Sequence, residues 1–219
     1  MNYPSLNTVS YEKLTEMFLS RNSAGHQQSE DETFLLLCEV AAAIVQRGGF
    51  DGVRFLLNVI PTTTYDQVRA ALTGLAFTPN HAAVSCRLEI ANKLLSLLRD
   101  GRPMVVAQAI RTLSVLGFDE VKERIMQKID HPSPYVVGSV LDYLSRNHPH
   151  TARALLLERL QHEQDGIVLQ HIIDNLDELG CVEAMPQIKR LVGHEDRWVD
   201  QAARTAVANL CPGGTTNGD

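Results

Sequence analysis

Apolar residues recur in the second half of the chain at a spacing of 31 or 32 residues. They form three columns, made of Val105, Val136, Val168 and Val199; of Ala109, Val140, Ile172 and Ala203; and of Leu113, Leu144, Leu176 and Val207. Within one repeat the three positions follow one another at i, i+4 and i+8, so they lie on one face of a helix. A repeat of this size cannot bury its own apolar face, and neighbouring repeats must stack to make a continuous core. The pattern therefore predicts a stack of helical repeats.

Each repeat carries a second apolar triplet downstream of the first. The triplets are Val121, Ile125 and Ile129; Ala152, Leu156 and Leu160; and Ala184, Ile188 and Val192. They have the same i, i+4, i+8 spacing, so each repeat is predicted to be a hairpin of two helices. Gly117 and Gly180 stand between the two helices, where a chain that leaves a helix often needs a positive φ. His148 occupies the matching place in the middle repeat.

The N-terminal part of the chain is predicted to be helical as well, with less regular spacing. The expected helices cover about residues 10–20, 34–45, 51–60, 64–75 and 79–98. Two capping boxes support them, Ser29 with Glu32 before the second helix and Thr64 with Gln67 at the start of the fourth. Asp51 is expected to cap the third helix.

We predict one elongated domain, because the repeat register continues to the C-terminal region. Residues 1–60 are expected to cap the stack and residues 61–211 to form it. The individual repeats are expected at about 61–101, 102–131, 132–162, 163–194 and, as a half repeat, 195–211. Residues 212–219 are rich in Gly and Thr and are expected to be a disordered tail.

Two segments resemble the HEAT family of helical repeats, and in particular its short subtype named after phycobilisome lyase subunits. They are Asp66–Leu72 and Glu195–Ala203, each with an acidic residue, a Val and an Ala-rich first helix. The middle repeats have Val106, Val137 and Leu169 where the subtype usually has Arg. The resemblance covers roughly residues 61–211. It implies an all-α fold, a right-handed α-solenoid of antiparallel hairpins with first helices on its convex side and second helices on its concave side.

Composition excludes several classes of partner. The formal charge of −6 and the pI of about 5.7 provide no general attraction to nucleic acid or to anionic lipid.

The four cysteines, Cys38, Cys86, Cys181 and Cys211, are far apart and form no CxxC motif, so we expect small buried side chains in a reducing compartment. The N-terminal residues lack the pattern of a signal peptide, and no apolar run reaches membrane-spanning length. We expect a cytoplasmic protein that binds no membrane.

Three histidines close successive repeats in register, His131, His162 and His194. Iron hydroxylases built from HEAT-like repeats also use His-Glu pairs, and His162 and His194 are each followed by Glu. Stacked helices lie about 8–10 Å apart, whereas a metal–nitrogen bond is about 2.0–2.1 Å long. We therefore expect these residues to close loops and predict no bound metal or other cofactor.

One column directly precedes the core valines and consists of Met104, Tyr135, Ile167 and Trp198. It has two interpretations. The residues can form an apolar ridge that receives a partner, with Tyr135 and Trp198 as anchors. They can also fold over the seam between repeats as hydrophobic staples. The second interpretation is favoured from sequence alone.

The second helices offer another candidate partner surface, which is mildly basic. Its candidate residues are Lys122, Lys128, Arg153, Arg159 and Arg190. HEAT-like stacks usually bind through the concave side, where the resemblance places these helices. The alternative is a solvated helix face whose charges pair with nearby acidic residues.

No pattern of a known catalytic site is present. The sequence lacks a GxSxG elbow, a P-loop and an HExxH motif, so we do not expect an enzyme. The leading hypothesis is a non-catalytic adaptor or scaffold that binds another protein. An alternative is an accessory or lyase-type protein for a tetrapyrrole chromophore, which the resemblance suggests by association. A nucleic-acid enzyme like the HEAT-like alkylpurine glycosylases is disfavoured by the acidic pI and the single Trp.

Overall fold

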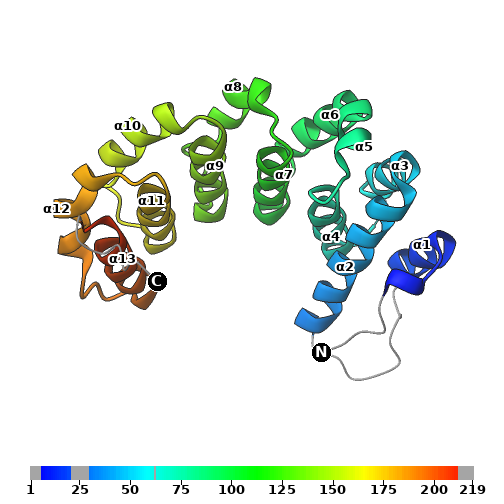
Figure 1. Cartoon of the computed structure of the whole chain (residues 1–219), viewed down its shortest axis with the longest axis horizontal. Helices are drawn as coiled ribbons and strands as arrows, with labels where there is room; N and C mark the ends of the chain where they lie inside the picture. The colour runs from blue at the N-terminus through cyan, green and yellow to red at the C-terminus, as the bar shows by residue number, and fades with distance from the viewer. Residues whose placement is uncertain (1–5, 21–29, 62, 212–219) are drawn as a thin grey trace, which may run out of the picture. The chain divides into compact units, whose positions relative to one another are not determined.

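The computed structural model describes residues 6–20, 30–61 and 63–211, and all secondary structure in these residues is helical (Figure 1). The expected all-α repeat fold is therefore confirmed. The chain divides into two compact units, Met1–Leu116 and Gly117–Asp219. One elongated domain stays a prediction. None of the described helices is both long and apolar enough to cross a membrane. The expected tail, residues 212–219, lies outside the described residues.

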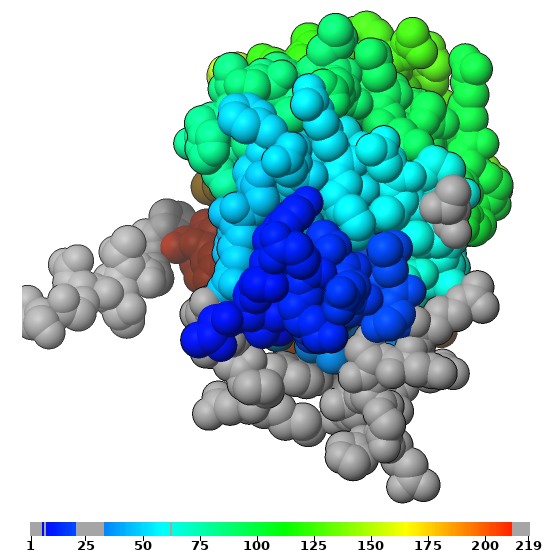
Figure 2. Space-filling model, turned by 90° about the vertical axis from the view of Figure 1, so that its right-hand side faces the viewer, coloured from blue at the N-terminus to red at the C-terminus, as the bar shows by residue number. Residues whose placement is uncertain are grey.

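The N-terminal unit contains two rows of helices. Its elements are η1 (Leu6–Thr8), α1 (Tyr11–Leu19), α2 (Glu30–Gly48), α3 (Phe50–Val59), α4 (Tyr65–Leu75), α5 (Asn80–Ser85), α6 (Arg87–Leu97) and α7 (Pro103–Val115). Helices α2, α4 and α7 pack side by side, while α3 packs on α2 and α4, and α6 packs on α7. Figure 2 shows this unit from the end at which α1 lies. There Phe18 of α1 meets Phe55 of α3 edge to face, with ring centroids 6.2 Å apart.

Local signals explain where these helices begin. Thr64 and Gln67 form the predicted capping box, in which the N–H of Thr64 donates to Gln67 Oε1 at 3.0 Å. The side-chain amide of Gln67 also donates to the carbonyl of Phe18 at 2.6 Å, so this cap ties α4 to α1. Asp51 does not cap α3 as predicted, because Gly49 with φ of 50° occupies the N-cap position. The other predicted box, Ser29 with Glu32, lies outside the residues whose side chains are described.

The prediction of a single long helix over residues 79–98 is wrong. The chain forms α5 and α6 instead, separated at Cys86, whose φ and ψ are −96° and 7°. Val84, Ser85 and Cys86 are three consecutive residues of modest helix propensity, which makes this the weakest point of the segment.

The C-terminal unit repeats the two-row plan more regularly. Its elements are η2 (Asp119–Val121), α8 (Lys122–Met126), α9 (Pro134–Asn147), α10 (Pro149–Arg159), α11 (Gly166–Glu178), η3 (Val182–Ala184), α12 (Met185–Ile188), η4 (Lys189–Leu191) and α13 (Arg197–Leu210). Helices α9, α11 and α13 pack directly on one another, and α8, α10 and α12 pack behind them.

The expected placement of first and second helices is reversed in this unit. Figure 1 shows α9, α11 and α13 on the inner side of the unit's curve and α8, α10 and α12 on its outer side. The first helices are long and pack along one another, whereas α8 and α12 have only five and four residues; a 3₁₀ turn precedes α8, and one lies on each side of α12. The stack therefore bends toward the closely packed first helices.

The predicted columns form the core. All four valines of the first column are at most 3% exposed, and the second column is fully buried. Two predicted core residues near the C-terminal end of the stack are less covered, since Val207 is half-buried and Val192 is 36% exposed. No further repeat follows α13 within the described residues to bury them.

The turns between helices follow the sequence signals with one exception. Gly117 and Gly180 have φ of 66° and 60°, as predicted. His148 does not enter this region and has φ of −139°. Pro149 follows it directly, and the residue before a proline is restricted to extended conformations.

Candidate interaction surface

The first turns of α9, α11 and α13 lie in register at one edge of the C-terminal unit. Asp165 caps α11 by accepting the N–H groups of Ile167 and Val168 at 2.9 and 3.2 Å. Asp196 caps α13 by accepting the N–H of Trp198 at 2.8 Å. Both caps were predicted. Ser133 stands at the N-cap of α9, also as predicted, but its side chain makes no capping bond.

The residues that precede the core valines project from this edge. Tyr135 is 45% exposed and Trp198 is 53% exposed, while Ile167 between them is half-buried. Arg197 stacks over the Trp198 ring at 4.6 Å from its centroid. We call Tyr135, Ile167 and Trp198 the edge ridge. Its two aromatic side chains keep about half of their surface in solvent, which favours the ridge interpretation over staples that cover the seam. The fourth member of the predicted column, Met104, is half-buried in the N-terminal unit.

The register histidines close the turns before these helices. Nδ1 of His131 accepts the N–H of Ser133 at 3.0 Å, and Nδ1 of His194 accepts the N–H of Asp196 at the same distance. Burial lowers the pKa of His131, and the nearby charge of Lys128 lowers it further. Two of the three histidines predicted to close loops, His131 and His194, therefore do so.

In the turn before α11, the side chain of Glu163 takes the place that a histidine has in the other two turns. His162 is exposed, and Glu163 Oε1 accepts the N–H groups of Gln164 and Asp165, both at 3.0 Å. The described residues contain no group of three or more His, Cys, Asp or Glu side chains placed to hold a metal ion.

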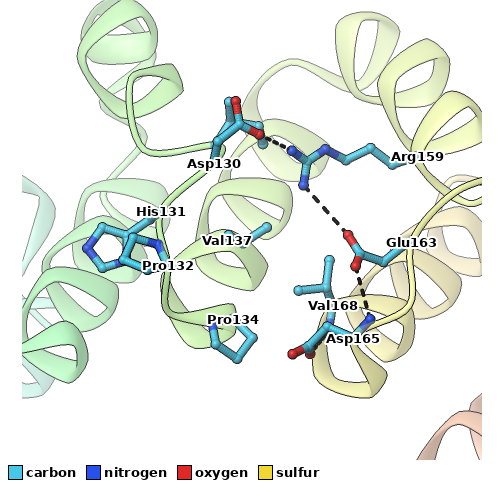
Figure 3. A pocket seen from close by; sticks show the side chains of 10 residues that line it. Asp130, His131, Pro132, Pro134, Val137, Arg159, Glu163, Asp165 and Val168 are labelled. Atoms are coloured by element: carbon cyan, nitrogen blue, oxygen red, sulfur yellow. Dashed lines mark hydrogen bonds and ion pairs between the residues drawn. The ribbon is translucent and has the colours of Figure 1, made fainter.

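A hollow of about 220 Å³ lies beside the edge ridge, between the turn that precedes α9 and the one that precedes α11 (Figure 3). Its apolar lining consists of Ile129, Pro132, Pro134, Val137 and Val168, and its polar lining of Asp130, His131, Arg159, Glu163 and Asp165. Figure 3 shows the Arg159 guanidinium between two carboxylates. It pairs with Asp130 and lies 3.8 Å from Glu163 Oε2. The pair between Asp130 and Arg159 therefore connects two consecutive repeats.

The predicted basic surface on the second helices is not one free patch. Arg153 pairs with Glu183 of the next repeat, with Nε 3.0 Å from Oε1. Lys122 donates from Nζ to the hydroxyl of Thr151 at 3.2 Å. Together with Arg159, these residues bind polar groups of a neighbouring repeat. The remaining two candidates are separate, since Lys128 is half-buried after α8 and Arg190 is exposed in η4.

A polar contact between α9 and α11 was not anticipated from sequence. Nδ1 of His171 lies 2.9 Å from Asp142 Oδ1, and the side-chain amide of Asn175 donates to the same oxygen at 2.8 Å. Gly138 makes room for this arrangement, because a Cβ at that position would lie 2.3 Å from Cδ2 of His171. The only sequence signal was a Gly inside a helix, which is costly unless a close approach requires it.

Comparison with known proteins agrees with the repeat architecture. The family model described as HEAT repeats matches residues 91–177, and no curated protein matches the sequence. The crystal structure of an engineered protein from the Northeast Structural Genomics Consortium has a TM-score of 0.55 at 20% identity, covering 93% of this chain and 99% of its own. The complex of CpcE and CpcF of phycocyanin lyase from Nostoc sp. PCC7120 has a TM-score of 0.51 at 16% identity, covering 91% and 82%. These likenesses confirm the HEAT-like solenoid and say nothing further about activity.

Proposed function

We propose that this HEAT-repeat chain is a non-catalytic adaptor that binds another protein through the edge ridge of its C-terminal unit. The observation that carries the proposal is the exposure of two large aromatic side chains, Tyr135 at 45% and Trp198 at 53%, directly beside valines that are fully buried. Tyr and Trp are the residues most enriched among those that dominate binding energy in protein interfaces. A repeat stack places such residues at fixed intervals on a rigid surface.

The backbone of the edge ridge is held in place before a partner arrives. Tyr135, Ile167 and Trp198 lie in the first turns of α9, α11 and α13, and a side chain of Asp165 or Asp196 caps the latter two helices. The core valine that follows each ridge residue anchors the turn in the stack. A pre-organised surface loses less conformational entropy on binding, so a few aromatic contacts suffice for specific recognition.

The basic residues of the second helices fit a structural role better than a binding role. Arg153 and Arg159 already pair with carboxylates of a neighbouring repeat. A partner that engaged either guanidinium would have to compete with these pairs. Lys128 and Arg190 remain proposed contributors to a secondary contact.

The lyase-type alternative has weaker support. Its basis is a likeness in fold to the complex of CpcE and CpcF at 16% identity, and proteins of one fold differ widely in function. Addition of a free bilin followed by visible absorbance tests this alternative, because a bound bilin changes its absorption spectrum. A cytoplasmic location is part of the adaptor proposal and rests on four cysteines that are far apart in sequence.

Site-specific photocrosslinking tests the adaptor proposal directly. A photoreactive amino acid is placed at position 135 or 198, and crosslinks formed in native lysate are identified by mass spectrometry and repeated with the purified partner. Position 77 serves as the matched control, because Phe77 is 54% exposed but lies in the N-terminal unit. The proposal expects one protein that crosslinks at both ridge positions and not at position 77. Equal capture at all three positions would show that crosslinking is nonspecific, and it would refute the edge ridge as the binding surface.

A further inference from the structure

The hollow beside the edge ridge carries excess negative charge. Asp130, Glu163 and Asp165 contribute three carboxylates to its lining, and Arg159 contributes the only guanidinium, so the formal charge of these four residues is −2. His131 adds no positive charge while its Nδ1 accepts the N–H of Ser133. Anionic side chains of a partner are therefore disfavoured at this place and cationic ones are favoured.

Of the two carboxylates that pair with Arg159, Asp130 is the more accessible, with a side chain that is 81% exposed against 20% for Glu163. Arg159 contacts it through Oδ1, whereas the Arg159 side chain itself is only 22% exposed. A cation that arrives from solvent therefore meets the carboxylate of Asp130 before it meets the guanidinium of Arg159.

The other walls of the hollow are apolar and come from the starts of α9 and α11. Pro132 and Pro134 flank the N-cap of α9, and Val137 and Val168 are buried members of the same lining. A volume of about 220 Å³ holds several water molecules, so a long side chain can enter and displace them. An aliphatic stem beneath a charged head group matches such a lining, because long basic side chains bury the stem and keep the charge near solvent.

We propose that the hollow receives an arginine side chain of the partner protein that binds the edge ridge. This inference rests on the proposed function. Arginine fits better than lysine, since its guanidinium is more weakly hydrated than an ammonium and carries five N–H donors, which can reach Asp130 beside Arg159, the residue that already contacts Oδ1. Position supports the same assignment, because Pro134 directly precedes Tyr135 and Val168 directly follows Ile167. A partner segment laid across these two ridge residues passes the mouth of the hollow.

Titration of the full chain with blocked amino acids, followed by amide NMR signals, tests the inference without the natural partner. The probes are N-acetyl-arginine methylamide, its uncharged analogue from citrulline, and the corresponding glutamate compound. Arginine is expected to shift the signals of residues 130–137 and 163–168, and citrulline to bind about fivefold more weakly, as expected for loss of one exposed ion pair. Equal binding of citrulline, preferential binding of glutamate, or no shifts in these segments would overturn it.

Variants that remove charge from the hollow supply a second test of arginine binding. Asp130→Asn with Glu163→Gln keeps the shape of both side chains and the acceptor that Glu163 offers to Asp165, and it should weaken arginine binding about fivefold or more. Asp174→Asn with Glu178→Gln is the matched control, because it removes the same charge from exposed positions of α11 and should leave the binding unchanged. Equal weakening by both double variants would reduce the effect to net charge and refute the site.

The two proposals fail separately. If the partner that crosslinks to the edge ridge binds the Asp130 and Glu163 double variant as tightly as the parent, the arginine site is refuted and the adaptor proposal stands. If blocked arginine binds in the hollow but no protein crosslinks to positions 135 and 198, the adaptor proposal fails while the cation site remains.

Discussion

Nδ1 of His131 accepts the main-chain N–H of Ser133 at 3.0 Å, one turn before the edge ridge begins. His194 makes the same contact to Asp196 two repeats later, also at 3.0 Å. A ring nitrogen can accept a hydrogen bond only while it carries no proton. The turn before α9 therefore depends on a His131 Nδ1 that carries no proton, and this links the stability of the C-terminal unit to pH.

The first prediction concerns this pH dependence. Burial, and to a lesser degree the charge of Lys128, lowers the pKa of His131 in the folded protein below its value in the unfolded chain. The unfolded chain therefore binds the proton first, so the stabilisation is complete above about pH 6.5 and is lost as pH falls from there through the lower folded pKa. Urea unfolding between pH 8 and 5 should show this loss. His131→Asn keeps an acceptor that does not titrate and should flatten the profile, and an unchanged profile would contradict this role of His131.

The second prediction tests the stacking of repeats at Leu144, which is fully buried in the third column. Leu144→Ala should lower the free energy of unfolding by about 2–5 kcal/mol, and Leu144→Asp should unfold the unit partly or wholly because it buries an unpaired carboxylate. Circular dichroism during heating measures both. Val182→Asp, at a site that is 51% exposed, is the control and should change stability by less than about 0.5 kcal/mol. A Leu144→Asp variant that melts like the parent would show that the register is wrong.

The third prediction concerns the close approach of Gly138 to His171. Gly138→Ala would normally favour a helix, but here the added Cβ meets the imidazole ring at 2.3 Å, so a loss of about 1–3 kcal/mol is expected. His171→Ala makes room for the methyl group. In a double-mutant cycle the two changes should therefore cost less together than the sum of their separate costs. Strictly additive costs would mean that the two residues do not interact.

The fourth prediction concerns Tyr143, which is fully buried and donates from its hydroxyl to the carbonyl of Phe118 at 2.7 Å. Tyr143→Phe leaves that carbonyl without this donor and should cost about 1–3 kcal/mol. Burial, followed by the charges of Asp119 and Glu120, raises the pKa of Tyr143 to about 12. The stabilisation that comes with this raised pKa is complete below about pH 10 and is lost as pH rises toward 12. Alkaline titration by tyrosinate absorbance checks the pKa, and Tyr135→Phe at the exposed ridge should leave stability unchanged.

Much of the fold could be predicted because one spacing governs the core. Val136, Val168 and Val199 recur in register, and each is buried against the neighbouring repeat as the spacing requires. The break at Cys86 depends on a small local balance of helix propensity that an apolar pattern does not report. The side toward which the stack bends depends on how closely the first helices pack on one another, and an apolar pattern does not report this.

The candidate site could be predicted only in part. The column that contains Tyr135 and Trp198 was visible from its register, but exposure depends on which neighbours reach a side chain, and the sequence favoured the opposite interpretation. The hollow was missed because Asp130 and Arg159 come from different repeats and meet only when the turns stack. The pairing of Arg153 with Glu183 was missed for the same reason.

The most direct test of the adaptor proposal is the affinity of the crosslinked partner for the Trp198→Ala variant, measured by calorimetry alongside thermal melting. We predict an affinity at least about tenfold weaker, equivalent to about 1.4 kcal/mol, with a melting temperature within about 2 °C of the parent. Unchanged affinity, or a large fall in melting temperature that marks Trp198 as a packing residue, would contradict the edge ridge as the binding surface.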